Sequence, residues 1–377
     1  MKKNIMPLLL AVCMTASSLP VTAMAGDTAE AGQEEMADGE SDGDEPQGEE
    51  PDGEEPEGEE PEGDKPQDGG SNGEGSEGEN GGSETLSIEE QIEAGEVSVS
   101  SITELEEVVA ALNADENDNE VTVNIAEGSY EVTGNEKLTI RRENVTLKGA
   151  GQEKTIINCG EYSNSGQGGI IIDADNVTIE DLTVKSSSES GNVAAIKVTA
   201  LEAIEGEMRL VENTVIRNVT VSSDNGHGIN LHGTENAVID GLTVENAGKA
   251  GISLANAVNV TIENTEALSE NCSWGSVAMM FAEGEAYKNP VSVVYGEGND
   301  IDYIYADERN AEDYEGVNSI HFDAAYDGEI AGDIKEVSVS EGVDVPETFK
   351  YAASVNGAYF TTINGAIEAA NDGDTVK

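Results

Sequence analysis

The residues with the clearest potential for chemistry are an aspartate and two histidines near the middle of the chain, Asp224, His227 and His232. A histidine with a nearby carboxylate can act as a general acid or base. Asp224 and His227, however, stand in a glycine-rich stretch that indicates a turn, where polar side chains are common for structural reasons. We therefore favour an exposed structural role and keep Asp224, His227 and His232 as the candidate catalytic residues.

Other combinations of residues indicate no complete site. Cysteine and histidine spacings match no zinc site, and His321 stands alone after Ile320. Cys159 and Cys272 are more than a hundred residues apart, so whether they pair stays open. Clustered aspartates can supply the oxygens that Ca²⁺ prefers, but their spacing matches neither an EF-hand nor a nonapeptide calcium repeat. We predict solvated acids and no cofactor, with Ca²⁺ as the one ion left open. These aspartates are Asp300, Asp302, Asp307, Asp313, Asp323 and Asp327.

The elements that must position these residues repeat along the chain. The segment Asn213-Thr-Val-Ile-Arg-Asn-Val-Thr-Val221 can be laid on Asn236-Ala-Val-Ile-Asp-Gly-Leu-Thr-Val244, and Asn259-Val-Thr-Ile-Glu-Asn-Thr265 follows. The interval is about 23 residues, which is the length of a solenoid repeat. The two later copies are preceded by Gly-Ile-x-Leu, at 228–231 and 251–254. Short alternating segments broken by Gly and Asn predict β-strands that stack coil upon coil.

Stacking in register assigns a direction to each side chain. Asn144 and Asn176 extend the series upstream, so the asparagines should form a ladder at a turn. The isoleucines that follow should form one interior column: Ile179, Ile216, Ile239 and Ile262.

The same register predicts a charged row on the outside of the coils. Arg217 should lie between Glu180 and Asp240 on neighbouring coils, with Lys148 and Glu263 further along the row. Opposite charges on adjacent strands stabilise sheets. We therefore interpret Arg217 as an ion-pair partner and not as a catalytic base.

The N-terminal part is predicted to lack a fold. Residues 1–25 have the basic start, apolar run and Ala-Met-Ala site of a secretion signal. This run is too short to span a membrane, and no other segment is apolar enough to do so. Residues 26–97 form an acidic, Pro/Gly/Glu-rich spacer with too few large apolar side chains to fold. The formal net charge of −60 disfavours nucleic acid and anionic membranes as partners. We expect a secreted, cell-surface-associated protein.

Folded structure is predicted to begin with a cap helix near 101–114. Its start, Ser101-Ile-Thr-Glu104, has the form of a capping box, and apolar residues then recur at helical spacing. They are Leu105, Val108, Val109 and Leu112.

The coils should occupy 98–281, with a less regular β-rich continuation at 282–350. In the last segment, 351–377, the order of cap helix, polar turn and strand returns. We interpret it as the start of a second module and expect the sequence to be a truncated piece of a longer protein. The apolar face of this last helix should comprise Ile363, Ala366, Ile367 and Ala370.

Over roughly residues 100–281 these repeats resemble the right-handed parallel β-helix of the pectin-lyase-like superfamily. The resemblance implies an all-β solenoid with an N-terminal amphipathic cap helix, preceded by the disordered acidic spacer. Pectate lyases of this fold carry Trp-Ile-Asp-His after the Asn turn, calcium-binding aspartates and an Arg-x-Pro stretch that bears the base. Here that place has Ala237-Val-Ile-Asp-Gly241, and Arg-x-Pro does not occur in the sequence. The resemblance is therefore specific for the fold and poor for the activity.

Two functions remain open. We favour a secreted or cell-surface β-helix module for adhesion or glycan contact that is not catalytic, because the set of catalytic residues is incomplete. Its partner would be an extracellular glycan or a host or cell-surface component. The alternative is a pectin-lyase-like polysaccharide lyase, hydrolase or epimerase acting on extracellular glycans through Asp224, His227 and His232. Fold analogy alone is a weak argument for it, because sites and not folds carry activity.

Overall fold

The computed structural model describes residues 86–133, 138–160, 168–188, 193–202, 208–280, 289–307 and 316–377. All of them belong to the second of two compact units, Asn80–Lys377. The expected signal at 1–25, the spacer as far as residue 85, and Asp313 lie outside the described residues.

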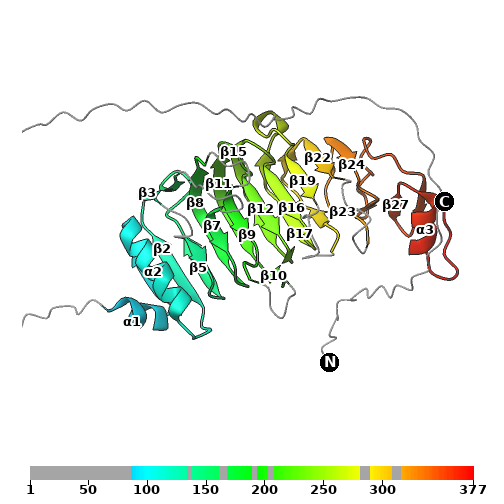
Figure 1. Cartoon of the computed structure of the whole chain (residues 1–377). Coiled ribbons are helices and arrows are strands. Elements are labelled where there is room, and N and C mark those ends of the chain that lie inside the picture. The colour runs from blue at the N-terminus through cyan, green and yellow to red at the C-terminus, as the bar shows by residue number, and fades with distance from the viewer. Residues whose placement is uncertain are drawn as a thin grey trace, which may run out of the picture. The chain divides into compact units, whose positions relative to one another are not determined.

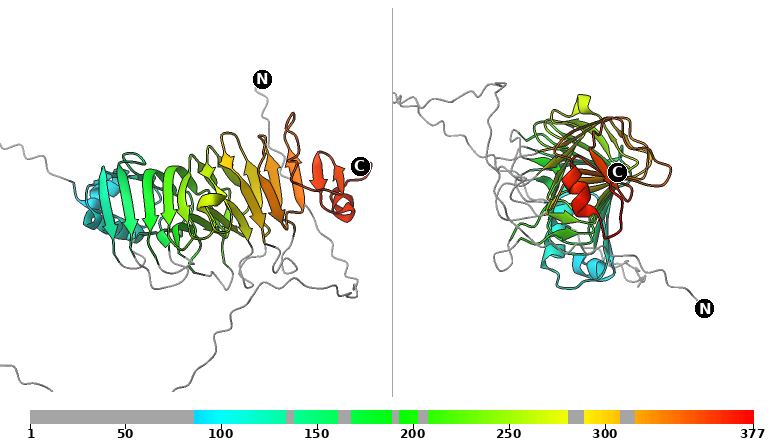
Figure 2. Two further views of the ribbon diagram at one scale, coloured as in Figure 1. Left: turned by 90° about the horizontal axis from the view of Figure 1, so that it is seen from above. Right: turned by 90° about the vertical axis from the view of Figure 1, so that its right-hand side faces the viewer.

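Parallel strands stack coil upon coil along one axis (Figure 1), and Figure 2 shows the same stack from above and from one end. Over the described ranges, sheet A has 17 strands. They are β1 (Glu96–Val99), β2 (Val121–Ile125), β3 (Gly128–Val132), β5 (Val145–Lys148), β6 (Thr155–Cys159), β8 (Thr178–Ser186), β11 (Val215–Ser223), β14 (Val238–Asp240), β15 (Thr243–Ala247), β17 (Val260–Glu263), β18 (Glu266–Ala267), β20 (Ser292–Tyr295), β21 (Asp300–Ile301), β23 (Ser319–Phe322), β25 (Glu336–Val339), β26 (Ala353–Val355) and β27 (Ala358–Phe360).

Sheet B has eight strands among the described residues and forms the other side of the stacked coils. They are β4 (Thr139–Ile140), β7 (Gly168–Ile172), β9 (Ala194–Val198), β12 (Ile229–His232), β16 (Ile252–Ala255), β19 (Val277–Met280), β22 (Tyr303–Ala306) and β24 (Glu329–Gly332). A short pair, β10 (Val211–Glu212) and β13 (Thr234–Glu235), joins two neighbouring coils. The helices are α1 (Ile88–Glu93), α2 (Ile102–Ala114) and α3 (Ile363–Ala369), with a 3-10 turn η1 at Ser269–Asn271.

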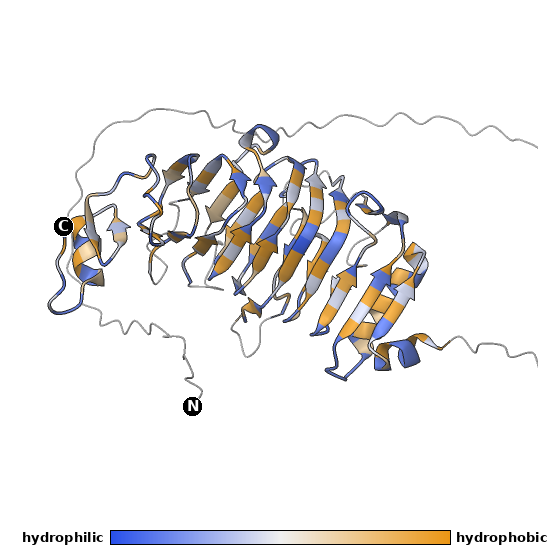
Figure 3. Ribbon diagram, turned by 180° about the vertical axis from the view of Figure 1, so that it is seen from behind, coloured by the Kyte–Doolittle hydropathy of each residue, from blue (hydrophilic) through white to orange (hydrophobic). Residues whose placement is uncertain are grey.

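The predicted interior column of isoleucines is confirmed. Ile216 pairs in register with Ile179 on one side and Ile239 on the other, and Ile239 pairs with Ile262. All four side chains are at most 1% exposed. Hydrophobic and hydrophilic residues alternate along the strands (Figure 3), because successive side chains of a strand point to opposite faces. The core is therefore the space between the two sheets.

The predicted asparagine ladder is also confirmed, and it occupies left-handed backbone. Asn144, Asn176, Asn213, Asn236 and Asn259 all have φ between 55° and 60°. The Asn213 side-chain amide donates to Asn176 Oδ1 at 2.9 Å, and that of Asn259 donates to Asn236 Oδ1 at 2.7 Å. Asparagine tolerates this conformation and bonds its amide within the stack, so it is suited to a turn that recurs in five successive coils.

A second ladder of turns, which the sequence patterns did not predict, follows the same sheet, and its first four members lie five residues after an asparagine of the first ladder. It has positive φ at Asp181, Asn218, Gly241, Asn264 and Gly298. The Asn218 amide donates to Asp181 Oδ1 at 3.2 Å. A Cβ atom at Gly241 would lie 2.7 Å from Asn218 Oδ1 on the neighbouring coil, so this position requires glycine.

The outward charged row is arranged as predicted. Lys148 Nζ lies 2.6 Å from Glu180, and Arg217 contacts Glu180 at 3.6 Å and Asp240 at 3.3 Å. The Arg217 side chain is 45% exposed, so solvent screens these pairs and their main effect is to neutralise repulsion between stacked acids.

Helix α2 lies beside the first coil, and its four predicted apolar residues are all buried. Ser101 Oγ accepts a hydrogen bond from the Glu104 backbone amide as an N-cap residue does, whereas the Glu104 carboxylate accepts from the Ser100 amide and does not complete the capping box with Ser101. The expected end of the spacer at residue 97 is wrong, because helix α1 and strand β1 precede α2. Ile92 and Val97 are buried there, so two short apolar segments within an acidic context are enough to extend the core.

The C-terminal segment differs from the prediction for its helix. In α3 only Ala366 is buried, whereas Ile363 and Ile367 are 59% and 56% exposed. Ala366 packs with Ala353, Val355 and Phe360 in a small core separate from the main one. Strand β27 pairs antiparallel with both β26 and β25, so the small core lies against the last parallel strand.

We expect Asn213→Ala to lower the free energy of unfolding by about 1–2 kcal/mol, because alanine tolerates left-handed backbone poorly and loses the amide bond to Asn176. Asn213→Gly should lose less, because glycine adopts this backbone freely. Thermal unfolding followed by circular dichroism compares the two variants. Equal losses would contradict the assignment of backbone strain to this position.

Candidate functional site

The outer face of sheet B presents one continuous row of side chains. Lys197, Asn230, Ser253, Ala278 and Tyr305 stand in register on successive strands from β9 to β22. The row changes from polar at Lys197 and Asn230 to small at Ala278 and aromatic at Tyr305. The row therefore offers polar contacts at one end and an aromatic surface at the other.

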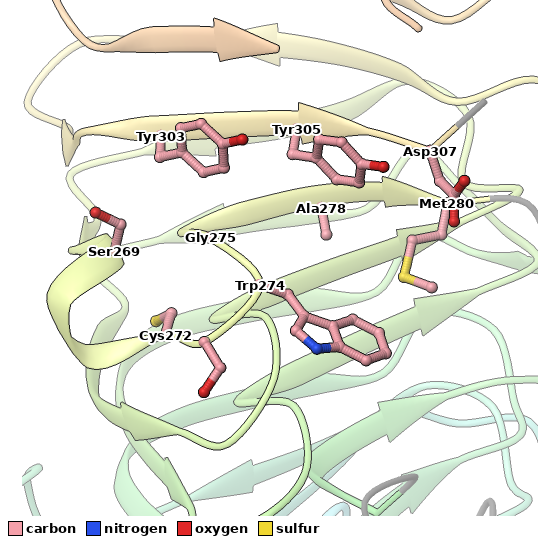
Figure 4. Close-up of a pocket in the computed structure, with 10 residues that line it drawn as sticks. Ser269, Cys272, Trp274, Gly275, Ala278, Met280, Tyr303, Tyr305 and Asp307 are labelled. Atoms are coloured by element: carbon pink, nitrogen blue, oxygen red, sulfur yellow. The ribbon is translucent and has the colours of Figure 1, made fainter. Parts of the chain in front are cut away.

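A cavity of about 560 Å³ opens on this face around β19 and β22. Figure 4 shows Tyr303 and Tyr305 projecting from β22 on one side, Trp274 on the other, and Ala278 between them. Met280 and Asp307 lie together at one end. Because Ala278 is small, the aromatic rings form walls with open space between them.

Trp274 is held in place by contacts on its own side of the cavity. Its backbone amide donates to the Lys249 carbonyl at 3.3 Å, the Lys249 ammonium lies 4.4 Å from the indole centroid, and the His227 ring meets it edge-on at 5.5 Å. The next residue, Gly275, has φ 108°, and a side chain there would come within 2.4 Å of the Tyr303 ring. Glycine is thus what allows the tryptophan turn and Tyr303 to approach each other.

Asp302 fixes the loop beneath this wall. It accepts hydrogen bonds from the Ser269 amide at 2.7 Å and from the hydroxyls of Ser269 and Ser276 at 2.6 Å each. Burial raises the pKa of Asp302, but these hydrogen bonds outweigh it and hold the pKa below its ordinary value. The prediction that Asp302 is a merely solvated acid is therefore wrong, because it is a structural acceptor.

The three predicted catalytic residues do not share one cavity. His227 is 5% exposed, and its Nδ1 accepts a hydrogen bond from the Ala250 amide at 3.3 Å. His227 is therefore buried, and the expectation that it is exposed is wrong. Burial and the nearby Lys249 charge lower its pKa to about 4, so the ring is neutral near neutral pH.

His232 and Asp224 lie at different places. His232 is on β12, with its Nδ1 3.5 Å from Thr199 Oγ1, and burial followed by the Lys197 charge lowers its pKa to about 4. Asp224 is exposed and lines a separate cavity of about 270 Å³ with Lys185 and Cys159. These residues are close together along the chain, but the chain changes direction between them, so their side chains lie in different places.

Lys197 and Asn230 accompany His232 on the outer face of sheet B. Burial lowers the pKa of Lys197 below its ordinary value. Within the described part of the chain, Asn230 Oδ1 is buried and has no hydrogen-bond partner. A buried, unsatisfied acceptor beside a lysine is costly for stability and is common where ligands bind.

Trp274, Tyr303 and Tyr305 are not among the candidate site residues predicted from the sequence. A signal was present, since aromatic residues make up only 4% of the chain and Trp274 is its single tryptophan. Tyr303 and Tyr305 alternate with Ile304, which places both rings on the outer face. Their approach to Trp274 depends on a loop geometry that no local pattern encodes.

Two further features of the described residues concern metals and cysteines. Neither a group of three possible metal-ligating residues nor a helix long and apolar enough to cross a membrane occurs among them. Cys159 and Cys272 are both buried and are not joined in a disulfide. Burial raises the pKa of Cys272 to about 11, so its thiol stays protonated at the base of the cavity.

Comparison with known proteins identifies the fold. The family described as "Right handed beta helix region" matches residues 144–268 and 207–303. With the parallel registers above, this makes the structure a right-handed parallel β-helix. A search of curated proteins returned no match.

Several solved structures are similar to this chain at low identity and low TM-score. A pectin methylesterase in complex with a hexasaccharide is 10% identical with a TM-score of 0.39, over 70% of this chain and 91% of the other. The Azotobacter vinelandii mannuronan C-5 epimerase A-module is 13% identical with a TM-score of 0.36, over 66% and 74%. The Erwinia chrysanthemi pectin methylesterase is 14% identical with a TM-score of 0.33, over 62% and 92%. These similarities carry no information about the activity of this chain.

The burial of His227 predicts a dependence of stability on pH. The unfolded ring takes up a proton below its ordinary pKa of 6.5, whereas the folded ring does so only near 4, so acidification between these values favours unfolding. From pH 7 to pH 5 we expect the wild type to lose about 1–2 kcal/mol more stability than His227→Gln. Thermal unfolding of both proteins across this range measures the difference, in which the shared carboxylate contributions cancel. Parallel curves would contradict the expectation.

Proposed function

We propose that the chain recognises an extracellular saccharide, which stacks in the cavity between Trp274 and the two tyrosines of β22. The observation that carries the proposal is the trio of aromatic rings around a floor made by Ala278 (Figure 4). Sugar rings present apolar C–H faces that pack against aromatic faces, while their hydroxyls need polar partners at the edge. Asp307 and Ser273 line the same cavity and supply such partners.

Exposure and shape support a ligand that comes from solvent. Trp274 is 41% exposed, which is unusual for a tryptophan held by its own backbone contacts and by Lys249. A large aromatic side chain kept rigid at the surface gives a binding site contact area at low entropic cost. The row that continues to Ser253, Asn230 and Lys197 gives an extended chain further polar contacts on adjacent coils.

The charge of the molecule supports neutral saccharides over polyanionic ones. The chain has a formal net charge of −60, and Asp307 adds a carboxylate to the cavity itself. Like charges across an interface oppose association. The predicted secretion signal accords with a glycan partner outside the cell, and this location is part of the proposal.

The single tryptophan makes the site directly observable. Titration of the full chain with neutral and uronic-acid oligosaccharides should change the emission of Trp274, with the neutral series binding more tightly. Tyr305→Ala should weaken binding about tenfold, which corresponds to the loss of roughly 1.4 kcal/mol of stacking. Tyr351→Ala is the matched control, because Tyr351 is 51% exposed in the C-terminal segment and lines no part of this cavity. Equal binding by both variants would refute the proposal.

A second candidate function, turnover of the bound glycan, is favoured by the Lys197, Asn230 and His232 group. Lys197 has a pKa lowered by burial, so a neutral amine that can accept a proton is more accessible there than on an exposed lysine. Together with neutral His232 it supplies a general base beside the saccharide row, as lyase or epimerase chemistry requires. This second candidate applies to the uronic-acid oligosaccharides, which we expect to bind more weakly than the neutral series. This candidate includes only His232 of the residues chosen from the sequence.

Turnover predicts an unsaturated product absorbing in the near ultraviolet, or a changed sugar configuration seen by NMR, when the full chain is incubated with a glycan panel. His232→Gln and Lys197→Met should each slow product formation about 10²-fold, whereas Asp224→Asn should have no effect because it lines a different cavity. Binding without product in the wild type would leave recognition alone as the function.

A further inference from the structure

A serine, a histidine and an aspartate meet on the outer face of sheet A, away from the aromatic cavity. His321 on β23 is in register with Ser338 on β25, and Asp323 follows two residues after His321. The next outward position of β25 leads to Ser340. Four polar groups thus stand on two adjacent strands at the C-terminal end of the solenoid.

The distances order these groups around the imidazole ring. His321 Nδ1 lies 2.8 Å from Ser338 Oγ, and Nε2 lies 3.1 Å from Asp323 Oδ1 and 3.2 Å from Ser340 Oγ. Ser340 also donates a hydrogen bond to Asp323 Oδ1. The two ring nitrogens therefore face a hydroxyl on one side and a carboxylate on the other.

The carboxylate determines which nitrogen carries the proton of the neutral ring. An ionised aspartate only accepts hydrogen bonds, so Nε2 must donate to Asp323 and Nδ1 is left with its lone pair. That lone pair accepts the hydroxyl hydrogen of Ser338. The order serine, histidine, aspartate is that of an activated nucleophile, a general base and the group that orients it.

We propose that Ser338 is a nucleophilic serine, activated by His321 and positioned through Asp323, which hydrolyses small carboxylic esters. Ser338 Oγ forms a bond to the ester carbonyl carbon while its proton passes to His321 Nδ1. The C–O bond to the alcohol then breaks, and the alcohol leaves with that proton. Water, deprotonated by the same nitrogen, attacks the acyl-serine and releases the carboxylic acid and the free hydroxyl of Ser338.

The openness of the site indicates the class of substrate. The side chains of His321 and Asp323 are 37% and 47% exposed, so an ester on a large molecule can reach Ser338 as long as its acyl group is small. Acetyl esters of accessible hydroxyls fit this description. The general base His321 is the main catalytic group, so we expect ester hydrolysis to be about 10²-fold faster than in a protein that lacks this base. The site is independent of the saccharide cavity, and either can fail without the other.

The test uses the full chain with a fluorophosphonate probe and with 4-nitrophenyl acetate. We expect the probe to label Ser338, identified by mass spectrometry, and ester hydrolysis to fall about 10²-fold in Ser338→Ala and His321→Gln. Ser319→Ala is the matched control, because Ser319 lies on β23 at the outward position in register with Glu336 and is outside the cluster. It should keep the wild-type rate.

Asp323→Asn separates catalysis from structure. Its amide can donate to Nε2, which places the ring proton on Nδ1, where it blocks the transfer from Ser338. We expect hydrolysis to fall about tenfold or more while circular dichroism and the melting temperature stay close to those of the wild type. Labelling of Ser338 no faster than that of other serines, or labelling unaffected by His321→Gln and Asp323→Asn, would overturn the proposal and leave a hydrogen-bonded surface cluster.

Discussion

The in-register hydrogen bonding of parallel strands is the constraint on which the rest of the structure depends. Once Val215, Ile216 and Arg217 pair with Thr178, Ile179 and Glu180, every neighbouring position on the coil is fixed as inward or outward. A slip by one residue would place Arg217 in the core and Ile216 in solvent. Core packing and the charged row both follow from this single register.

The turns maintain that register because they use residues that accept left-handed backbone. Asparagine and glycine recur at two corners of sheet A, where the side-chain amides bond from coil to coil. The coils between these corners differ in length, and the cavity is built where one of them departs from the repeat. Trp274 and Gly275 belong to that departure, so recognition is assigned to an irregular segment supported by a regular scaffold.

Much of the fold could be predicted from the sequence because it is periodic. The Asn-x-x-Ile spacing fixed the interior column at Ile179, Ile216, Ile239 and Ile262, and the charged row around Arg217 followed from the same alignment. The site could not be predicted in this way. Asp224, His227 and His232 are close along the chain, but the chain changes direction between them and they lie at different places on the coil. Residues become neighbours in space when they occupy equivalent positions on successive coils.

Trp274 and Tyr305 illustrate the opposite case, since 31 positions separate them along the chain and yet they line one cavity. The same holds for His321 and Ser338, which are 17 residues apart and in hydrogen-bonding contact. Local patterns indicate only the face on which such a residue lies. Partners across the face depend on the length of the intervening loop, which residue types alone do not determine.

The antiparallel pairing of β27 with β25 has a consequence for the behaviour of the molecule in concentrated solution. An open edge of a long parallel sheet is a template onto which another chain can add its own strand, and filaments grow from such edges. Glu336, Val337 and Ser338 are matched instead by Phe360, Tyr359 and Ala358 running the other way. The hairpin therefore pairs with the backbone of β25 over these three residues, and this part of the last parallel strand is not an open edge for a second chain.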